Sequence, residues 1–198
     1  MPVDHEIDSR NKNIQIYING SFYHRDEAKI SVYDSGFLMG DGIWEGLRLV
    51  NNKWIFIDEH IDRLFEGCKA IDLDIKMTKE DIVNALDETK TINNMSNEVH
   101  ARLMITRGNK SKPFQQPHLS ESGINIVIIM EHSKPSIDVK NITMATVPQV
   151  RGMPMSQDPE VNSHSELNCI LACIQANKLG ADEALMLDPL GFVNTTNS

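Results

Sequence analysis

The 198-residue sequence predicts an α+β fold divided into two domains. Short apolar runs between turn residues predict strands, and segments with apolar residues every three or four positions predict amphipathic helices. A proline-containing stretch, Glu131 to Asp138, has the composition of an interdomain linker. We therefore expect an N-terminal α+β domain over residues 1–133 and the start of a mainly β domain over residues 134–198.

The composition indicates a globular enzyme rather than a membrane or nucleic-acid-binding protein. Apolar residues make up 40% of the chain and charged residues 24%, which is ordinary for a globular domain. The net charge of −9 argues against nucleic acid or an anionic membrane as the main partner. No apolar run approaches the roughly 20 residues that span a bilayer, and the N-terminus lacks the apolar core of a signal peptide. Three cysteines, an odd number, favour a reducing cytoplasm.

The N-terminal region predicts a β-hairpin. Residues 1–12 are polar, and we expect them to be frayed. Ile14 to Ile18 alternates as a strand does, and Asn19-Gly20 is a tight turn into Phe22-Tyr23. Lys29 to Tyr33 predicts another short strand.

The rest of the first domain is organised around the stretch from Asp34 to Leu64. Three glycines, at positions 36, 40 and 42, predict a turn that feeds the strand Ile43 to Val50. Asn51-Asn52 then turns the chain into a returning strand, Trp54 to Ile57.

A helix follows from Asp58, a good N-cap residue. Its apolar positions have helical spacing: Ile61, Leu64, Cys68 and Ile71. Arg63 therefore lies in the second turn of a helix that comes directly after a strand. Glycines let a backbone approach a ligand closely, and an arginine fork suits a phosphate. A hairpin and a helix with a solvated arginine explain the same residues without any ligand.

A second helix begins at Thr78, where Asp81 completes a near-capping box. Ile82, Leu86 and Thr89 continue its helical spacing.

Two further strands, Asn97 to Thr106 and Gly123 to Met130, are joined by a polar loop over residues 108–122. The loop carries Pro113 and Pro117, which argue against a continuous helix. A loop of this length is often functional.

The second domain opens with a strand, Asn141 to Val147, and an irregular stretch, Val150 to Val161. Ser163 and Glu166 form a capping box for the next helix. Its buried stripe is expected to be Leu167, Ile170, Leu171 and Ile174.

Gly180 is expected to stop that helix. A strand from Glu183 to Asp188 follows, apolar at Leu185 and Leu187, and Pro189 to Gly191 turns the chain back.

Four blocks of sequence carry a family resemblance: YINGSF at Tyr17 to Phe22, DSGFLMGDGIWEGLRL with EHIDRL from Asp34 to Leu64, ARLMITRG at Ala101 to Gly108, and GADEALMLDPLGFV at Gly180 to Val193. In this order they resemble the class IV pyridoxal-phosphate-dependent aminotransferases. That family holds branched-chain and D-amino-acid aminotransferases and aminodeoxychorismate lyases. The resemblance implies the two-domain fold type IV of these enzymes. It also implies a C-terminal barrel-like domain that is incomplete here, because family members continue past the position of Ser198.

The resemblance implies amino-group transfer between an amino acid and a 2-oxo acid, with pyridoxal 5′-phosphate as cofactor. It also implies a homodimer in the complete protein, whereas the cytoplasmic location is expected from the cysteine count. The alternative is a non-catalytic or fragmentary family member that lacks the lysine needed to hold the cofactor.

The lysine is the main departure from the family pattern. Class IV enzymes hold the cofactor as a Schiff base on a lysine just ahead of the helix expected near Ser165. Counting back from Gly180 puts that position within one residue of Asn162, and anchoring on Leu167-Asn168 puts it at Ser165 or Glu166. No lysine occurs between Lys140 and Lys178, so the sequence offers no catalytic lysine. The capping box explains Glu166 without any chemistry.

The resemblance assigns the other candidate residues. Arg63 matches the family's phosphate-binding arginine, and Thr195 falls where the family has the glutamate that pairs with the pyridine nitrogen. Trp44 and Glu45 match positions near the substrate, although an aromatic residue on a strand is more often core. Arg107 is a candidate for a substrate carboxylate or else a solvated strand-end arginine.

Cys169 and Cys173 lie one helical turn apart near His164, a pattern that suggests a metal. A buried helix face accounts for both cysteines, and we expect no metal.

Overall fold

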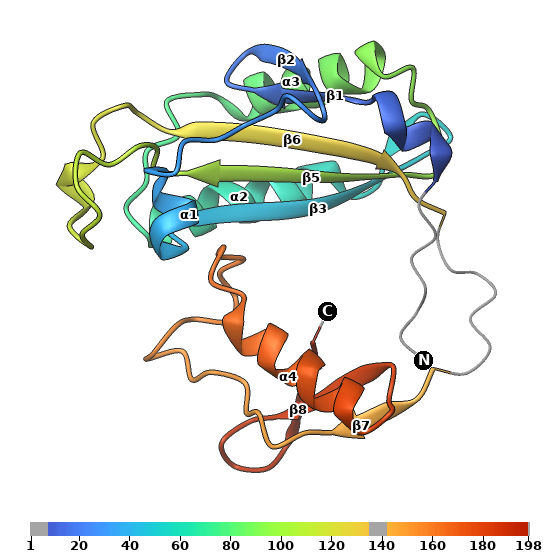
Figure 1. Ribbon diagram of the computed structural model, residues 1–198, viewed down its shortest axis with the longest axis vertical. Helices are drawn as coiled ribbons and strands as arrows, with labels where there is room; N and C mark the ends of the chain where they lie inside the picture. The colour runs from blue at the N-terminus through green and yellow to red at the C-terminus, as the bar shows by residue number, and fades with distance from the viewer. Residues whose placement is uncertain (1–7, 135–141, 198) are drawn as a thin grey trace. The chain divides into compact units, whose positions relative to one another are not determined.

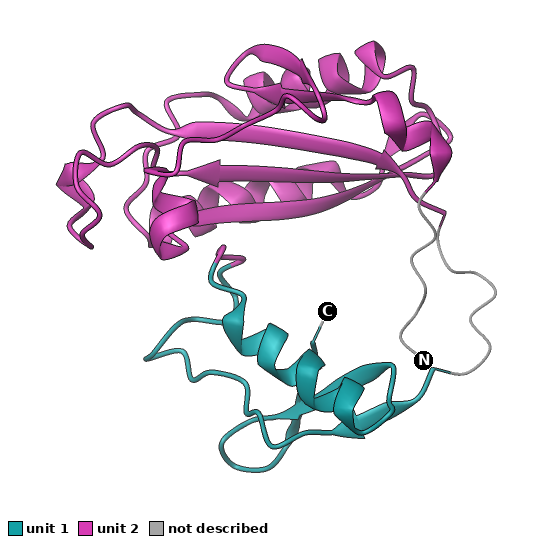
Figure 2. Ribbon diagram, in the orientation of Figure 1, with its two compact units in different colours: residues 1–6, 136–161, 165–198 teal, residues 7–135, 162–164 magenta. Residues whose placement is uncertain are grey.

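The computed structural model describes residues 8–134 and 142–197 (Figure 1). The chain divides into two compact units (Figure 2). The larger comprises residues 7–135 together with Asn162–His164, and the smaller comprises residues 1–6, 136–161 and 165–198. The second half of the expected linker, residues 135–138, lies outside the described residues. The first two linker positions were predicted wrongly, because Glu131 and His132 belong to a strand.

The larger unit is built on a six-stranded sheet with the order β2-β1-β6-β5-β3-β4, in which every recorded strand pair is antiparallel. The strands are β1 (Gln15–Ile18), β2 (Ser21–His24), β3 (Gly42–Val50), β4 (Lys53–Trp54), β5 (Val99–Thr106) and β6 (Asn125–His132). The predicted hairpin is confirmed, since Asn19 and Gly20 take φ values of 50° and 86° between β1 and β2. Two left-handed residues in succession match the twist of the flanking strands.

Two helices, α2 (Ile57–Ala70) and α3 (Lys79–Ile92), cover one face of this sheet (Figure 1). The odd-numbered residues of β3 are buried on that face, whereas most of its even-numbered residues are partly exposed on the other. The helices contribute the apolar residues that the spacing predicted, including Ile61, Leu64, Ile82 and Leu86. The capping box of α3 is also confirmed, with Thr78 and Asp81 bonded in both directions.

The N-terminal segment is more ordered than predicted. Residues 8–12 are not frayed, because Ser9–Asn13 forms a 3-10 helix, η1, capped by Asp8. Asn11 is 5% exposed and exchanges two hydrogen bonds with the backbone of His132. The Asn11 side chain thus holds this N-terminal segment against the end of β6.

The stretch before β3 also differs from the prediction. Lys29–Tyr33 forms no strand, and the glycine-rich turn contains a short helix, α1 (Ser35–Met39). Asp34 caps this helix by accepting hydrogen bonds from the backbone of Gly36 and Phe37, and Gly40 ends it at φ 70°. Residues 29–33 therefore lead into the cap of α1 and do not form a strand of the sheet.

The entry to α2 was predicted wrongly as well. The returning strand β4 stops at Trp54, and Ile57 already begins the helix. Phe56, not Asp58, is the N-cap residue, with φ 51° and no side-chain cap bond. Asp58 instead lies in the first turn, where its charge is favourable for the helix dipole.

We expect Phe56→Asn to stabilise the chain by about 0.5–1 kcal/mol, because a left-handed φ strains a bulky residue and suits asparagine. The Phe56 side chain is 69% exposed, so little packing is lost. Urea unfolding measures the effect, and Phe37→Asn, at a residue 73% exposed in α1, is the control without positive φ. A lower urea midpoint for Phe56→Asn would show that the exposed ring contributes more than the strain costs.

The smaller unit, as far as it is described, pairs one helix with a three-stranded sheet. Strand β7 (Met144–Thr146) runs parallel to β8 (Glu183–Leu187), and β9 (Val193–Thr196) is antiparallel to β8. Gly180 and Gly191 take φ values of 76° and 89° at the predicted helix stop and turn. The core residues are Val147, Ala172, Ala176, Ala181, Ala184 and Met186.

The helix of this unit, α4 (Leu167–Lys178), buries a different face from the predicted one. The expected stripe is exposed, with fractions of 65% for Leu167, 52% for Ile170, 39% for Leu171 and 43% for Ile174. Ala172 and Ala176 face the sheet instead, since small side chains let the helix approach it closely. On β8 the buried residues are likewise Ala184 and Met186, not the two leucines.

The predicted capping box of α4 is also wrong. Glu166 itself is the N-cap residue, so Ser163 lies three residues ahead of the cap.

Candidate functional site

Glu45 on β3 and two residues of α2 form a buried ionic cluster. The Arg63 guanidinium donates from Nε to Glu45 Oε1 over 2.7 Å and from Nη2 to Oε2 over 2.6 Å. His60 Nδ1 lies 2.8 Å from the same Oε2. The carboxylate is 0% exposed, whereas the Arg63 side chain is 49% exposed. The hydrogen bond to Glu45 raises the pKa of Arg63, so the guanidinium is held in its charged form.

Local sequence explains this cluster. Alternation along β3 turns Glu45 toward the helices, between the buried Ile43 and Leu47. His60 and Arg63 are three residues apart on α2 and therefore share a face of the helix. The sequence placed Arg63 correctly in the second turn, but nothing in its pattern singled out His60.

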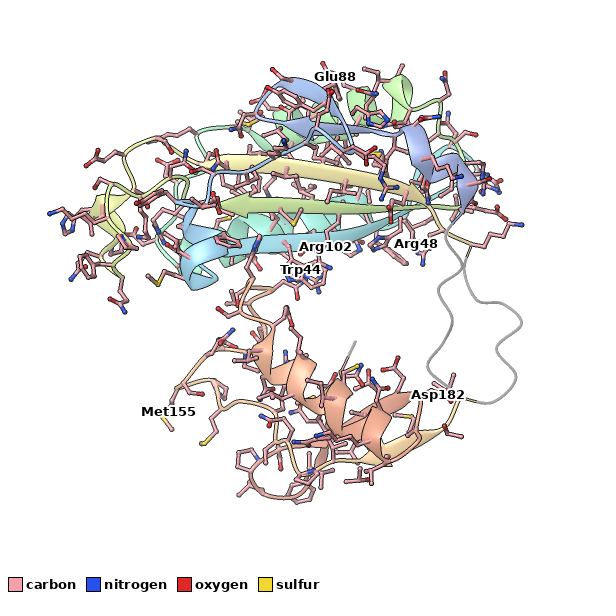
Figure 3. All side chains as sticks on the ribbon, viewed as in Figure 1. Trp44, Arg48, Glu88, Arg102, Met155 and Asp182 are labelled. Carbon is pink, nitrogen blue, oxygen red and sulfur yellow. The ribbon has the colours of Figure 1, made fainter. Side chains whose placement is uncertain are left out.

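Trp44 lies on the opposite face of β3 from Glu45. The Arg102 guanidinium carbon is 3.8 Å from the centre of its ring, and Trp44 Nε1 donates to the Ser163 carbonyl over 3.1 Å. Arg102 on β5 is paired with Gly46 and so lies between Trp44 and Arg48 of β3 (Figure 3). Arg102 was missed by sequence reasoning, although the alternation within ARLMITRG assigns it to the Trp44 face.

His100 is also on this face, paired with Arg48 across the two strands. Burial lowers the pKa of His100, and the charges of Arg48 and Arg102 lower it further.

A cavity of about 620 Å³ lies over this face of the sheet. Ile16, Val127, Ile129 and Met104 give it an apolar floor. Its polar lining residues include Arg25, Lys29, His100, Arg102, Glu131 and His164. Such a lining fits a ligand with an apolar body and an anionic group.

The segment Asn162–His164 adds to the free edge of β3. Trp44 N donates to the Asn162 carbonyl and His164 N donates to the Gly42 carbonyl, each over 2.9 Å. Ile43 and Ser163 form the bridge between the two chains. Asn162 is therefore on the Trp44 face, since residues opposite each other in an antiparallel pair share a face.

Gly42 permits this addition. A Cβ at Gly42 would lie 2.6 Å from the Ile105 carbonyl oxygen and 3.1 Å from the His164 ring. A larger residue would therefore clash with the backbone of β5 and would also require the His164 ring to shift.

Arg107 is bound within the larger unit. Its Nε and Nη2 donate to the Asp41 carboxylate, and Nη1 and Nη2 donate to the carbonyls of Asp72 and Ile71. The side chain is 14% exposed and closes the C-terminal end of α2. A substrate carboxylate at Arg107 stays a prediction, and it would compete with Asp41.

The remaining candidates lie in the smaller unit. Thr195 is on β9, paired with Met186. Cys169 is 2.7 Å from Arg151 Nη1, and burial raises the pKa of its thiol. Cys173 accepts a hydrogen bond from Asn177 within the same helix. Among residues 8–134 and 142–197, no group of three or more His, Cys, Asp or Glu side chains is arranged to hold a metal.

Comparison with known proteins identifies the family of the chain. The family model for amino-transferase class IV matches residues 42–198, which include β3, α2 and the edge segment. The chain belongs to this family. Membership confirms the resemblance that the four sequence blocks carry. It also confirms the α+β fold that the resemblance implied.

Two class IV relatives give the extent of the likeness. The chain is 33% identical over 189 residues to branched-chain-amino-acid aminotransferase-like protein 1 of Arabidopsis thaliana, covering 95% of this chain and 34% of that protein. It is 29% identical over 172 residues to a D-alanine aminotransferase of Staphylococcus haemolyticus, covering 86% and 59%. The chain thus spans about a third to three fifths of these curated relatives.

A branched-chain aminotransferase from Thermoproteus uzoniensis, solved with norvaline, has the same fold. It superposes with a TM-score of 0.83 at 24% identity, covering 94% of this chain and 63% of that one. In the described part of this chain, no helix combines the length and apolar character needed to cross a membrane.

The class IV cofactor fits this chain only in part. The Arg63 side chain is half exposed, and its guanidinium is a group suited to a phosphate. Asn162 offers an amide on the β3 edge rather than a primary amine, and Thr195 offers a hydroxyl rather than a carboxylate. Taken one by one, the Arg63 guanidinium suits a phosphate, whereas the Asn162 amide cannot bond to an aldehyde as an amine does and the Thr195 hydroxyl carries no charge to pair with a ring nitrogen.

Proposed function

We propose that this chain has the framework of a protein for pyridoxal-phosphate-dependent amino-group transfer between an amino acid and a 2-oxo acid, of the branched-chain or D-amino-acid type. Membership of class IV and the named relatives support the reaction type. The observation that carries the proposal is the Arg63 guanidinium, fixed on Glu45 with its other edge exposed. In this proposal Arg63 binds the cofactor phosphate.

The same proposal extends to the untested residues and partners. Trp44 is a candidate for substrate binding through its contact with Arg102, which lines the cavity, Arg107 is a candidate for a substrate carboxylate, and Thr195 is a candidate for the cofactor. The complete protein acts as a cytoplasmic homodimer. We also propose that the domain boundary is near residue 133, as the linker composition suggests.

One specific observation favours a second candidate function for the chain as printed. None of Asn162, Ser165 and Glu166 carries a primary amine. The chain would then hold the cofactor through its phosphate alone, as a non-catalytic member of the family. Covalent trapping of the cofactor separates the two candidates, because only the first requires a bond to a lysine.

We expect Arg63→Ala to weaken pyridoxal-phosphate binding by about ten- to a hundredfold, because a charge-assisted hydrogen bond contributes about 1.5–3 kcal/mol. Equilibrium dialysis of the full chain measures the dissociation constant. Arg10→Ala is the matched control, since Arg10 is 47% exposed and is paired with Asp8 away from the site. Equal affinities for the Arg63 variant and the unmodified chain would remove Arg63 from the cofactor site.

A further inference from the structure

Both carboxylate oxygens of Glu45 already have nitrogen partners, and neither is exposed to a small ligand. The carboxylate is fully buried, and burying an ionised carboxylate is unfavourable unless it is paired and hydrogen-bonded. Three nitrogen atoms satisfy it: Nε and Nη2 of Arg63 and Nδ1 of His60. All three belong to α2. Glu45 therefore acts on the helix and does not reach the face of β3 that carries Trp44.

The hydrogen bonds from Arg63 to Glu45 decide how Arg63 meets a ligand. A guanidinium has five N–H groups in one plane. Glu45 takes the Nε and Nη2 edge, which leaves the Nη1 and Nη2 edge on the opposite side. Because half of the side chain is exposed and the described residues supply no other recorded partner for it, this second edge faces solvent. An anion arriving there meets donors that are already oriented.

We infer that Glu45 is a positioning residue that acts through Arg63 on a bound phosphate, with His60 also contacting the Oε2 oxygen of the carboxylate. The inference rests on the proposed function, which supplies the phosphate. It differs from the sequence-based assignment of Glu45 to the substrate, and it explains why an acid is placed beside an anion site. Without Glu45, the long Arg63 side chain would have to be ordered by the ligand itself.

Glu45→Gln is the central test, because glutamine keeps the shape of the side chain and removes its charge. We expect pyridoxal phosphate to bind about tenfold more weakly, the factor for ordering one long side chain. Pyridoxal, which lacks the phosphate, should bind equally to both proteins. Glu80→Gln carries the same charge change at an exposed position of α3 and should have no effect.

A double-mutant cycle shows whether Glu45 acts through Arg63. In an Arg63→Lys background, Glu45→Gln should have no further effect on pyridoxal-phosphate binding. Lysine cannot make the bidentate hydrogen bonds that Arg63 makes with Glu45. The same tenfold loss in both backgrounds would overturn the inference. Equal losses for pyridoxal and pyridoxal phosphate would overturn it too.

A ligand-free measurement separates this inference from the proposed function. The Arg63 Nε–H should give a slowly exchanging NMR signal in the unmodified chain, identified by its loss in Arg63→Lys, and Glu45→Gln should abolish it. If the signal behaves in this way while pyridoxal phosphate does not bind at all, the cofactor proposal fails and the positioning role stands. If Glu45→Gln leaves the signal unchanged, the positioning role is wrong whatever the cofactor result.

Discussion

Borohydride reduction of the chain in the presence of pyridoxal phosphate is expected to leave every lysine without stoichiometric label. A covalent bond to the cofactor needs a primary amine held at the site. Asn162 occupies the β3 edge beside Trp44, and its carboxamide cannot supply that bond. Lys178 is the last residue of the 12-residue helix α4, about 18 Å along the axis from its start. Mass mapping of peptides after reduction measures the label.

Two matched variants test whether residue 162, on the edge of β3, is the position from which a lysine bonds to the cofactor. Asn162→Lys should acquire a stoichiometric label at residue 162, because the backbone bonds to β3 hold that residue beside Trp44. Glu166→Lys places the same amine at the N-cap of α4 and should stay unlabelled. Stoichiometric label on one lysine of the unmodified chain would contradict the prediction and support amino-group transfer by this chain. Label on Glu166→Lys alone would show that the lysine position is the one obtained by anchoring on Leu167-Asn168.

The largest loss of stability is expected from Asp34→Ala, at about 3–5 kcal/mol. Asp34 is 2% exposed, and its Oδ1 accepts from the backbone of Gly36 and Phe37. Its Oδ2 accepts from Thr106 Oγ1 and Asn125 Nδ2. Removing the carboxylate leaves these four donors without their acceptor, and two of them belong to buried residues at the ends of β5 and β6.

Urea denaturation of the full chain measures this loss. Asp26→Ala is the control, because its side chain is 78% exposed and surface changes shift stability by about 0.5 kcal/mol or less. A similar small change for Asp34→Ala would mean that water replaces the carboxylate at the cap of α1. Asp34 also lines the cavity, so the variant should alter its shape as well as the stability.

Local sequence was sufficient for two tight turns and for one helix cap. Asn19-Gly20 and Asn51-Asn52 adopt the positive φ values that their turns require. Thr78 and Asp81 are close enough in sequence to satisfy each other, and Arg63 follows from its distance to the start of α2. Family membership, too, could be predicted from the four blocks, since their order is a property of the sequence alone.

Tertiary contacts decided the rest. Helical spacing finds an apolar stripe on α4 but cannot say that the sheet of the smaller unit packs against its alanines. Phe56 caps α2 in a left-handed conformation that its own propensity disfavours. The partners of Glu45 lie 15 and 18 positions away on another element, so no local sequence pattern predicts them. Asn162 reaches β3 across more than a hundred residues, because a free strand edge offers backbone hydrogen bonds to whichever segment the fold brings there.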